Sequence, residues 1–436
     1  MNRFVPAENL IPSQGEIFNP VSGDCKALIE NIRETGRKEF ISKGLPTTKV
    51  ESWKYTDITP LTKVNFSFTP DQDFPADNSG IKKLLPEKLS DCSLVFINGK
   101  FNGDLSNVPE NKGIYIDNIR NIISSGNDNI LDFISSPDEG TDPLTNLNRA
   151  YLTDGAVIRV GADYDPGLPV HLIYLSVNTG SAGMSHPSNI IIAEAGSRIS
   201  LIEEYTGDPD STYFTNAVTE IDVQDNASVT HYKIQTESRK STHIGTLKIK
   251  QGKDTKFASY TATFGGSLTR NNIKATMNGT GSSSNIEGLY FLKGDQHTDN
   301  HTEVFHNYPS CNSIENFNGV LDENSRAVFD GKVYVAKDAA QTDSEQSSRS
   351  LLLSESASVD SKPSLEIYAD DVKCSHSASV GQLDTDSLYY LRSRGISEAE
   401  SMRILTSGFL KEILNRFEDR MVSEKIENLL NREIRL

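Results

Sequence analysis

The spacing of hydrophobic residues changes twice along the chain and divides it into three parts. In residues 1–150 apolar positions are either spaced as in helices or sparse, and from about residue 151 they alternate with polar ones in short runs. After residue 383 helical spacing returns. We therefore expect a mixed, mainly helical N-terminal region over 1–150, a β core over 151–383 and a helical C-terminal region over 384–436.

The N-terminal part contains one clear helix signal. The segment Asp24–Lys43 carries apolar residues at helical spacing, and Gly44–Pro46 ends it. We interpret the only tryptophan, Trp53, as a packing anchor, because a large amphipathic ring at a junction between regions needs no further role. From residue 66 to residue 148, Pro, Asn, Asp and Gly are frequent, and a single strand is predicted over 94–98.

The β core carries a loose internal repeat. Its expected turns share a small hydroxyl residue, and these residues are Ser197, Ser228, Thr255, Ser282, Ser325 and Ser358. Their successive offsets of 31, 27, 27, 43 and 33 residues are typical of solenoids. A two-sheet sandwich, with turns every ~8–12 residues, is the alternative. The expected fold is therefore mainly β, a right-handed parallel β-helix core flanked by N-terminal and C-terminal helical regions.

The C-terminal part predicts two helices. Ser397–Glu400 forms a capping box, in which each end of the motif can bond the other. The apolar stripes that follow are Ile404, Leu405, Phe409, Leu410, Ile413 and Leu414, and then Val422, Ile426, Leu429 and Leu430. These stripes have to be covered. They either dock onto the end of the β-helix, which needs a cap, or bind a partner protein, and the sequence favours neither.

Charge and cysteine content narrow the possible functions. With 43 Lys and Arg against 60 Asp and Glu, the net charge of −17 disfavours nucleic acid and anionic membranes as partners. No apolar run approaches a membrane span or a signal-peptide core, so a soluble, cytoplasmic protein is expected. The four cysteines stand singly, which argues against a disulfide framework and against a self-contained zinc site.

The densest group of potential metal ligands is the segment His297–Cys311. If this segment is extended, Asp299, His301 and Glu303 share one face, and His306 follows further along. Imidazole and carboxylate groups suit zinc or iron, so His301, Glu303 and His306 are a candidate metal site. The alternative is a strand with one face in water, whose polar residues need no metal. The spacing matches no standard closed site.

A second candidate site lies near the C-terminal end of the β core. Cys374 and His376 are two residues apart in a strand-like run, so both side chains should point to one face. Thiolate and imidazole are good iron ligands, but two ligands do not complete a metal or cluster site. Further ligands must then come from distant residues or from a partner chain. The alternative is a buried cysteine beside a hydrogen-bonded surface histidine.

Other chemistries find little support in the sequence. There is no phosphate-binding loop of the GxxxxGK[ST] type and no GxSxG nucleophile motif, so neither ATP hydrolysis nor serine esterase activity is expected. Asp370 and Asp371 are typical of the carboxylates of β-helical sugar hydrolases. However, adjacent strand residues point to opposite faces and cannot act as an acid and base pair. A β-helical carbohydrate-active enzyme is therefore the alternative function.

Seven tracts occur in the same order as in a known family. They are Trp53–Asp57, Phe329–Val333, Ala340–Asp343, Leu351–Ser354, Lys362–Tyr368, Asp370–Leu383 and Tyr389–Gly395. The chain resembles the SufD family of iron-sulfur cluster assembly proteins. The resemblance implies a β-helix with helical flanks and a non-catalytic scaffold of the SUF system. Ser377 replaces the Glu of the paralogue SufB, which favours the SufD branch.

The same resemblance implies partners and cofactors. The chain would pair with SufB and carry the ABC-type ATPase SufC on its C-terminal helices. His376, with Cys374, would face a nascent iron-sulfur cluster at the interface with SufB, and the complex would also use a flavin. The last strand is expected over 364–382, and its open edge would let the isolated chain form a homodimer.

Overall fold

The structure is a computed structural model that describes residues 2–11, 25–68, 78–125 and 142–434. The N-terminal elements are β1 (Phe4–Val5), η1 (Glu8–Leu10), α1 (Cys25–Lys43), β2 (Leu45–Pro46), η2 (Glu51–Trp53), η3 (Thr59–Lys63), α2 (Ser79–Leu84), β3 (Cys92–Ile97), β4 (Lys100–Phe101), β5 (Ile114–Asn118), α3 (Ile119–Ser125) and α5 (Pro143–Tyr151). The helix expected over Asp24–Lys43 and the strand near residue 94 are thus confirmed. None of the described helices combines the length and the apolar character that a membrane crossing requires.

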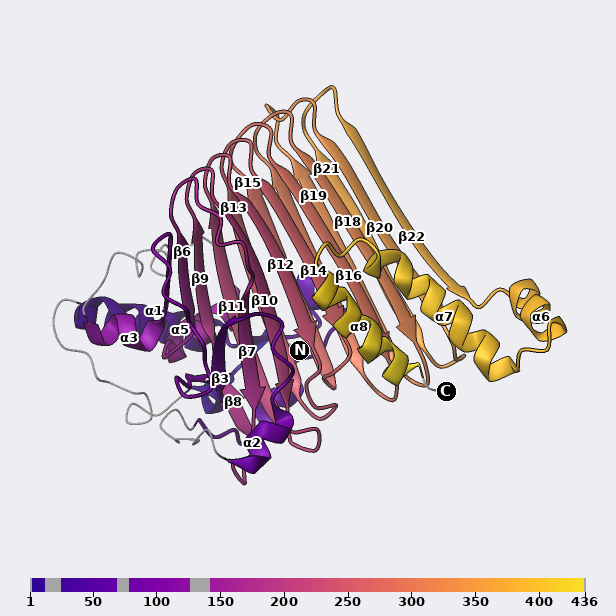
Figure 1. The fold of residues 1–436 in the computed structure, drawn as a ribbon, viewed down its shortest axis with the longest axis horizontal. Helices are drawn as coiled ribbons and strands as arrows, with labels where there is room; N and C mark the ends of the chain where they lie inside the picture. Colours follow the sequence, from indigo (N-terminus) through magenta and orange to yellow (C-terminus); the bar gives the residue numbers. More distant parts are fainter. Residues whose placement is uncertain (1, 12–24, 69–77, 126–141, 435–436) are drawn as a thin grey trace.

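The β core is a parallel solenoid built from two long sheets (Figure 1). Its strands are β6 (Ala156–Val160), β7 (Val170–Ser176), β8 (Gly183–Ser185), β9 (Ser188–Ala193), β10 (Arg198–Gly207), β11 (Tyr213–Val223), β12 (Ser228–Gln235), β13 (Thr242–Gln251), β14 (Lys256–Thr263), β15 (Leu268–Met277), β16 (Ser283–Leu292), β17 (His297–His306), β18 (Asn312–Leu321), β19 (Arg326–Val335), β20 (Asp343–Leu352), β21 (Ser358–Ile367) and β22 (Lys373–Gln382). From β9 onward, successive strands alternate between the sheets, so each turn contributes one strand to each. The mainly β, parallel solenoid fold predicted from the repeat is confirmed, and the sandwich is not formed.

We call the two sheets by their last strands. The β22 sheet runs β22-β20-β18-β16-β14-β12-β10-β7-β3-β4, and the β21 sheet runs β21-β19-β17-β15-β13-β11-β9-β6-β5. From β10 to β22, partners in register lie between 26 residues apart, as for Thr242 and Leu268, and 32 apart, as for Arg326 and Ser358. The offset of 43 in the sequence repeat is therefore an error of alignment. It passes from Ser282, before a strand of the β22 sheet, to Ser325, before a strand of the β21 sheet.

In the β22 sheet, the corner before each strand from β10 to β22 has one residue in the left-handed backbone conformation. These residues are Gly196, Asn226, Asp254, Gly281, Ser310, Gln341 and Asp371. From Gly196 to Gln341, the backbone N–H of each bonds to a carbonyl of the next turn, as Ser310 does to Ala340 at 2.9 Å and Gln341 to Asp371 at 2.8 Å. We call this series the corner ladder. Because each of these bonds joins one turn to the next, the corner ladder fixes the register between turns. Asn, Asp and Gly suit the corner because they tolerate the left-handed backbone conformation.

Alternation along each strand separates the solenoid interior from its outer faces. In β18, Ser313, Glu315 and Phe317 point inward and are at most 1% exposed, while Asn312 and Ile314 are exposed. The interior is apolar through many turns, with Leu201, Val229 and Phe257 among its members. Burial of these side chains supplies the main driving force for stacking the turns.

The N-terminal region covers the outer face of the β21 sheet. Trp53 is 3% exposed and packs in one cluster with Phe214 and Ile244, which lie on β11 and β13. The guanidinium of Arg270 lies 4.0 Å from the Trp53 ring centroid. Trp53 is therefore a packing anchor, as expected. Three strands of the N-terminal part, β3, β4 and β5, also join the sheets of the solenoid and extend them beyond the first turns.

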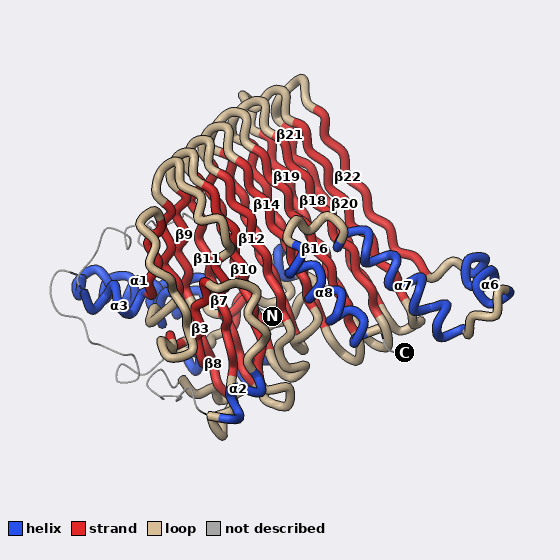
Figure 2. Tube along the Cα trace, in the orientation of Figure 1, coloured by secondary structure: helices blue, strands red, loops and turns tan. Residues whose placement is uncertain are grey.

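Three helices follow the solenoid, α6 (Thr385–Ser393), α7 (Glu398–Leu414) and α8 (Arg420–Glu433). Figure 2 shows α7 and α8 lying across the outer face of the β22 sheet, whereas α6 stands away from it. Leu410 and Ile426 pack there with Tyr260 and Leu289. The apolar stripes thus dock on the side of the solenoid, so the expected alternative of a cap on its end is wrong.

Polar contacts fasten these two helices to the sheet. Lys425 Nζ lies 2.5 Å from Glu204 Oε2, and the backbone N–H of Asp419 donates to the Tyr232 hydroxyl at 3.0 Å. At the start of α7 the Ser397 hydroxyl accepts the Glu400 N–H at 3.3 Å, but the Glu400 carboxylate binds Arg403 instead of returning to Ser397. The capping box is therefore formed on one side only.

Candidate functional site

The last turn of the solenoid is left open and carries Cys374 and His376. The single strand expected over 364–382 is divided at the corner before β22, where Asp371 has a φ of 54°. Both β21 and β22 pair with a strand on one side only. The end of the solenoid is therefore a pair of unpaired strand edges, which invites pairing with another chain.

Cys374 and His376 stand on the same face of β22, as their spacing predicts. They are in register with Ser344 and Gln346 of β20, both of which point into the interior and are at most 1% exposed. Cys374 and His376 thus occupy interior positions with no further turn above them. The thiol is half-buried and the imidazole is exposed. The face of β22 that elsewhere would be core is here a surface with a sulfur and a nitrogen ligand.

The thiol of Cys374 is not activated within the isolated chain. Burial and the nearby Asp343 carboxylate raise its pKa above the ordinary value for cysteine. A thiol with a raised pKa stays protonated at neutral pH, so a metal or a cation from elsewhere is needed to make it a thiolate ligand. His376 supplies the other donor atom on this face.

Two columns of buried polar residues lie beneath these two side chains. Under Cys374, Ser344 Oγ and Ser313 Oγ are 2.9 Å apart, and Ser313 Oγ is 2.9 Å from His306 Nε2. Under His376, Gln346 Nε2 donates to Glu315 Oε1 at 3.1 Å. We call these the serine column and the glutamine column. Both are fully enclosed below and end at the open turn.

Glu315 is a buried carboxyl group without a cation among its contacts in the described residues. It is 0% exposed, and burial raises its pKa to about 7, against the opposing effect of the Thr302 and Gln346 side chains. Its Oε2 and the Gln346 Oε1 have no hydrogen-bond partner among the described residues. The glutamine column therefore ends below His376 with an acceptor unused.

Cys311 belongs to a structural corner and not to the open end. The residues that follow the corner-ladder positions are mostly hydroxyl residues that bond a carbonyl three residues back, as Ser282 does to Gly279 at 2.6 Å and Thr342 to Ala339 at 2.8 Å. Cys311 takes that place in its own turn, 1% exposed, with Sγ 3.3 Å from both the Ser282 hydroxyl and the Gly279 carbonyl. Its thiol therefore replaces a hydroxyl.

The structure does not bring His301, Glu303 and His306 to one point. His301 and Glu303 lie on the outer face of β17, beside the cavity under the N-terminal region, whereas His306 points inward and is 0% exposed. Burial lowers the pKa of His301 to about 3 and that of His306 to about 4, so both rings are neutral. No group of three or more His, Cys, Asp or Glu residues able to hold a metal occurs within the described ranges.

The residues around that cavity act as an anchor. The cavity measures about 350 Å³ and is lined by Trp53, Arg270 and His301 among others. Arg270, 2% exposed, forms an ion pair with Asp299, whose carboxylate also accepts the Thr56 hydroxyl at 2.5 Å. Asp299 shares a face with His301 and Glu303, as expected, but it serves to attach the N-terminal region.

Asp370 and Asp371 do not form a carboxylate pair on a strand. They lie in the corner between β21 and β22, and the carbonyl of Asp371 accepts the Gln341 N–H of the corner ladder. Asp371 thus has a backbone role. This placement gives no support to a carbohydrate-active enzyme.

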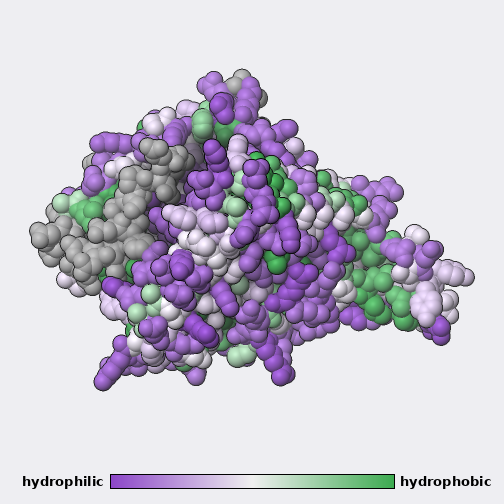
Figure 3. Space-filling view, turned by 90° about the horizontal axis from the view of Figure 1, so that it is seen from above, coloured by the Kyte–Doolittle hydropathy of each residue, from purple (hydrophilic) through white to green (hydrophobic). Residues whose placement is uncertain are grey.

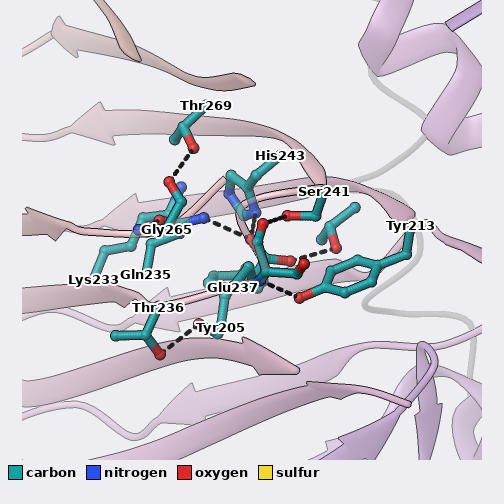
Figure 4. A network of polar contacts seen from close by, with 12 residues as sticks. Tyr205, Tyr213, Lys233, Gln235, Thr236, Glu237, Ser241, His243, Gly265 and Thr269 are labelled. Atoms are coloured by element: carbon teal, nitrogen blue, oxygen red, sulfur yellow. Dashed lines mark hydrogen bonds and ion pairs between the residues drawn. The ribbon is translucent and has the colours of Figure 1, made fainter. Parts of the chain in front are cut away.

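A second polar cluster, deeper in the solenoid, was not anticipated from the sequence (Figure 4). We call Glu203, Lys233, Glu237 and His243 the closed network; all four are at most 8% exposed. His243 Nδ1 lies 2.7 Å from Glu237 Oε2, and Lys233 Nζ donates to Asn271 Oδ1 at 2.8 Å. Burial lowers the pKa of Lys233 to about 8.

The carboxylates of the closed network are well supplied with donors. Glu203 accepts the Tyr205 and Thr219 hydroxyls at 2.8 and 2.7 Å. Burial opposes its ionisation, but bonds from His231, Thr219 and Tyr205 outweigh that effect and hold the pKa of Glu203 at about 2. The only sequence signal was polar residues at inward positions of strands, for example Lys233 in a run with Tyr232 and Ile234.

Hydrophobic side chains are also exposed where the solenoid stops. Figure 3, seen from above, shows apolar residues gathered on the side of the molecule that carries the last turn and α6. The exposed large hydrophobic side chains of the last turn and of α6 are Ile367, Tyr368, Val380, Tyr389 and Tyr390, of which Tyr389 is 75% exposed. Exposed apolar side chains at the end of the solenoid are typical of a protein interface.

Comparison with known proteins gives one consistent result. Residues 176–409 match the family described as SUF system FeS cluster assembly, SufBD core domain, and residues 17–171 match the SufBD protein N-terminal region. The chain is 31% identical over 405 residues to an iron-sulfur cluster assembly SufBD family protein of Synechocystis, covering 91% of this chain and 89% of that one. It is 29% identical over 393 residues to the iron-sulfur cluster assembly protein SufD of Escherichia coli, covering 89% of each.

A more distant relative shows that the similarity extends along the whole chain. The SufD protein of Bacillus subtilis is 26% identical over 419 residues, covering 94% of both sequences. The N-terminal region, the solenoid and the C-terminal helices are therefore shared together.

Proposed function

The chain belongs to the SufBD family of iron-sulfur cluster assembly proteins, and on that premise we propose that it is a non-catalytic, SufD-type scaffold subunit. It pairs with the paralogue SufB through the open last turn, in the cytoplasm. Cys374 and His376 are its contribution to a cluster that is assembled transiently at that interface. The isolated chain holds no cluster firmly, because its two donor atoms do not complete a site.

One observation carries the proposal. Cys374 and His376 occupy interior positions of a solenoid turn that no strand of the described residues covers, between two strand edges that are unpaired within those residues. A partner with the same kind of solenoid can pair with β21 and β22 and place its own ligands opposite the two side chains. In isolation, a second copy of this chain can occupy the same edges as a homodimer.

We assign SufC binding to the C-terminal helices. The inner faces of α7 and α8 are occupied by the β22 sheet, so the accessible surface is their outer side together with α6. On α6, Tyr389 and Tyr390 are 75% and 57% exposed. We assign a flavin to no described residue of this chain, and we propose no shared metal for His301, Glu303 and His306, because His306 points into the solenoid and the other two point out of it.

The test combines partner capture with a single substitution. Anaerobic affinity purification of the tagged chain from its own cells should recover an ABC-type ATPase and a paralogous SufBD protein, identified by mass spectrometry. In cells that depend on this chain, His376→Ala should abolish most of the activity of iron-sulfur enzymes, because it removes a donor atom at the cluster.

The matched control is Ser375→Ala. Ser375 lies on the same strand and is exposed on the opposite face, so it tests the effect of altering β22 itself. Full iron-sulfur enzyme activity in the His376→Ala cells, together with recovery of neither partner, would refute the proposal.

A further inference from the structure

The glutamine column has a fixed direction. Glu315, Gln346 and His376 occupy the same register on β18, β20 and β22, so their side chains stack one turn above another. Glu315 and Gln346 are both 0% exposed. Because Gln346 Nε2 donates to Glu315 Oε1, the amide nitrogen points down the column and the amide oxygen remains for another donor.

The facing strand holds the amide in that place. Gly331 of β19 lies against it, and a Cβ atom on Gly331 would come within 2.3 Å of Gln346 Nε2 and 2.8 Å of its Cδ. The Phe329 ring approaches the same point. A packed amide that donates to a carboxyl group on one side has little freedom to rotate.

The oxygen of this amide is a buried acceptor with no partner. Gln346 Oε1 makes no hydrogen bond within the described part of the chain, and a buried acceptor that stays unpaired destabilises the fold. The side chain in register above it is the imidazole of His376, one strand spacing away, ~4.8 Å between backbones. A neutral imidazole offers one N–H donor and one free nitrogen.

We propose that Gln346 is a positioning residue for His376: its Oε1 accepts the N–H of one ring nitrogen and leaves the other nitrogen free to bind a metal or a proton at the open turn. Glu315 fixes the amide that does this. The inference rests on the proposed function for His376, and it extends that function to two residues buried below the interface. Outer partners of this kind determine the tautomer and the orientation of a histidine ligand.

The serine column supplies the control. Ser344 is on the same strand as Gln346, two residues away, and is equally buried, but it lies below Cys374. Ser344→Ala removes a buried polar group from the same turn without touching the glutamine column. Gln346→Met keeps the length of the side chain and removes the acceptor.

The first experiment reads the tautomer of His376 directly. The full chain is labelled with 15N-histidine, the ring signals are recorded by long-range 1H–15N correlation above pH 8, and His376→Asn identifies the signal. The wild-type chain and Ser344→Ala should show one dominant tautomer. Gln346→Met should shift the ratio about tenfold toward the mixture seen for a free imidazole.

Glu315→Gln provides a second variant that preserves size. A Gln at position 315 can either donate or accept, so the direction of the Gln346 amide is lost and the tautomer ratio of His376 should again fall. If Gln346→Met does not fold, this variant decides the question. An unchanged tautomer in both folded variants, or an equal change in Ser344→Ala, overturns the proposal.

Cluster assembly gives a separate readout in the complex with the paralogue. Gln346→Met should slow cluster formation about tenfold, the lower end of the effect of losing an outer partner of a metal ligand, while Ser375→Ala, on the exposed opposite face of β22, leaves it unchanged. If Gln346→Met loses the tautomer preference but cluster assembly does not change, the positioning role of Gln346 is contradicted and the proposed function is not. If His376→Ala also leaves assembly unchanged, the proposed function itself fails.

Discussion

The interior of one solenoid contains two polar regions that are built differently. In the closed network the carboxylates of Glu203 and Glu237 receive hydroxyl, amide or imidazole donors, and Lys233 lies among them. In the glutamine column, Glu315 Oε2 and Gln346 Oε1 lack a partner among the described residues. The first region is enclosed by turns on both sides, and the second lies below a turn that ends the solenoid.

The polar groups of the closed network stabilise the fold, whereas those of the glutamine column have an acceptor that a ligand or a partner can use. A buried charge with its partners in place is costly to disturb, since removing one partner leaves the others unpaired in a low dielectric. A buried acceptor left unused near an open surface costs stability in the free chain and gains a partner when the site is occupied. The comparison therefore predicts opposite responses to substitution in the two regions.

The largest effect is expected in the closed network. Lys233→Met should lower the free energy of unfolding by about 3–5 kcal/mol, because it removes the bond to Asn271 and the positive charge that acts electrostatically on the buried Glu203 and Glu237. Chemical denaturation at pH 7 measures this, with the exposed Lys256→Met as the matched control. Equal stability of the two variants would show that the closed network does not hold the fold.

The next effect is a difference in pH dependence between the two buried carboxyl groups. Glu315 has a folded pKa of about 7, raised from 4.5, so its contribution to stability is complete below pH 4.5 and is lost as the pH rises through 7. The loss is about 3 kcal/mol, and Glu315→Gln should remove it. Unfolding free energies of wild type and variant between pH 4 and 8 give the comparison.

Glu203 should behave in the opposite way. Its pKa of about 2 in the folded chain lies below 4.5, so its contribution is present above pH 4.5 and is lost as the pH falls toward 2. Glu203→Gln should therefore flatten the acid side of the stability curve and leave the region from pH 5 to 8 unchanged. If both substitutions changed the pH dependence of the unfolding free energy in the same direction, the two regions would not differ electrostatically.

A smaller effect is expected for self-association through the open turn. Val380 is 49% exposed at the end of the solenoid, and Val380→Lys should weaken a homodimer about tenfold, equivalent to about 1.4 kcal/mol. Sedimentation equilibrium of the isolated chain measures it. Val108→Lys, at a site of 40% exposure in the N-terminal region, should leave the dimer unchanged; a dimer that loses affinity equally with both substitutions uses another surface.

The smallest effect concerns the cysteines. Cys311 occupies a hydroxyl position in its corner, so Cys311→Ser should change the unfolding free energy by less than about 1 kcal/mol.

In a Cys25→Ser background, a small thiol reagent should label Cys374 in the native chain, faster as the pH rises, and Cys92 and Cys311 only after unfolding. Native labelling of Cys311 at a similar rate would contradict its corner role.

The fold was largely predictable because its signals are local and repeated. Alternation and the recurring hydroxyl corners predicted the solenoid, and Asp24–Lys43 predicted α1. The half-turn error at Ser325 arose because both sheets use small hydroxyl residues at their corners, for example Ser282 and Ser325, which each bond a carbonyl three residues back. Spacing alone cannot tell one corner from the other.

The site was predictable only in part. The spacing of Cys374 and His376 predicted a shared face, but nothing near them in the sequence points to Gln346 and Glu315, which stack below His376 through register. His306 was misjudged for a different reason, since alternation along the single strand β17 places it inside while His301 and Glu303 face outward. Stacking between turns depends on the exact length of each turn, which a single sequence does not display.

The turns of the solenoid are joined at their corners only to their nearest neighbours. A whole turn added or removed between the N-terminal region and β22 would leave every other bond of the corner ladder in place. The separation between the N-terminal region and His376 is therefore set in steps of about 4.8 Å, the spacing between neighbouring strands. The length of the solenoid can therefore change only by whole turns, and a partner that binds both of its ends can fit only one number of turns.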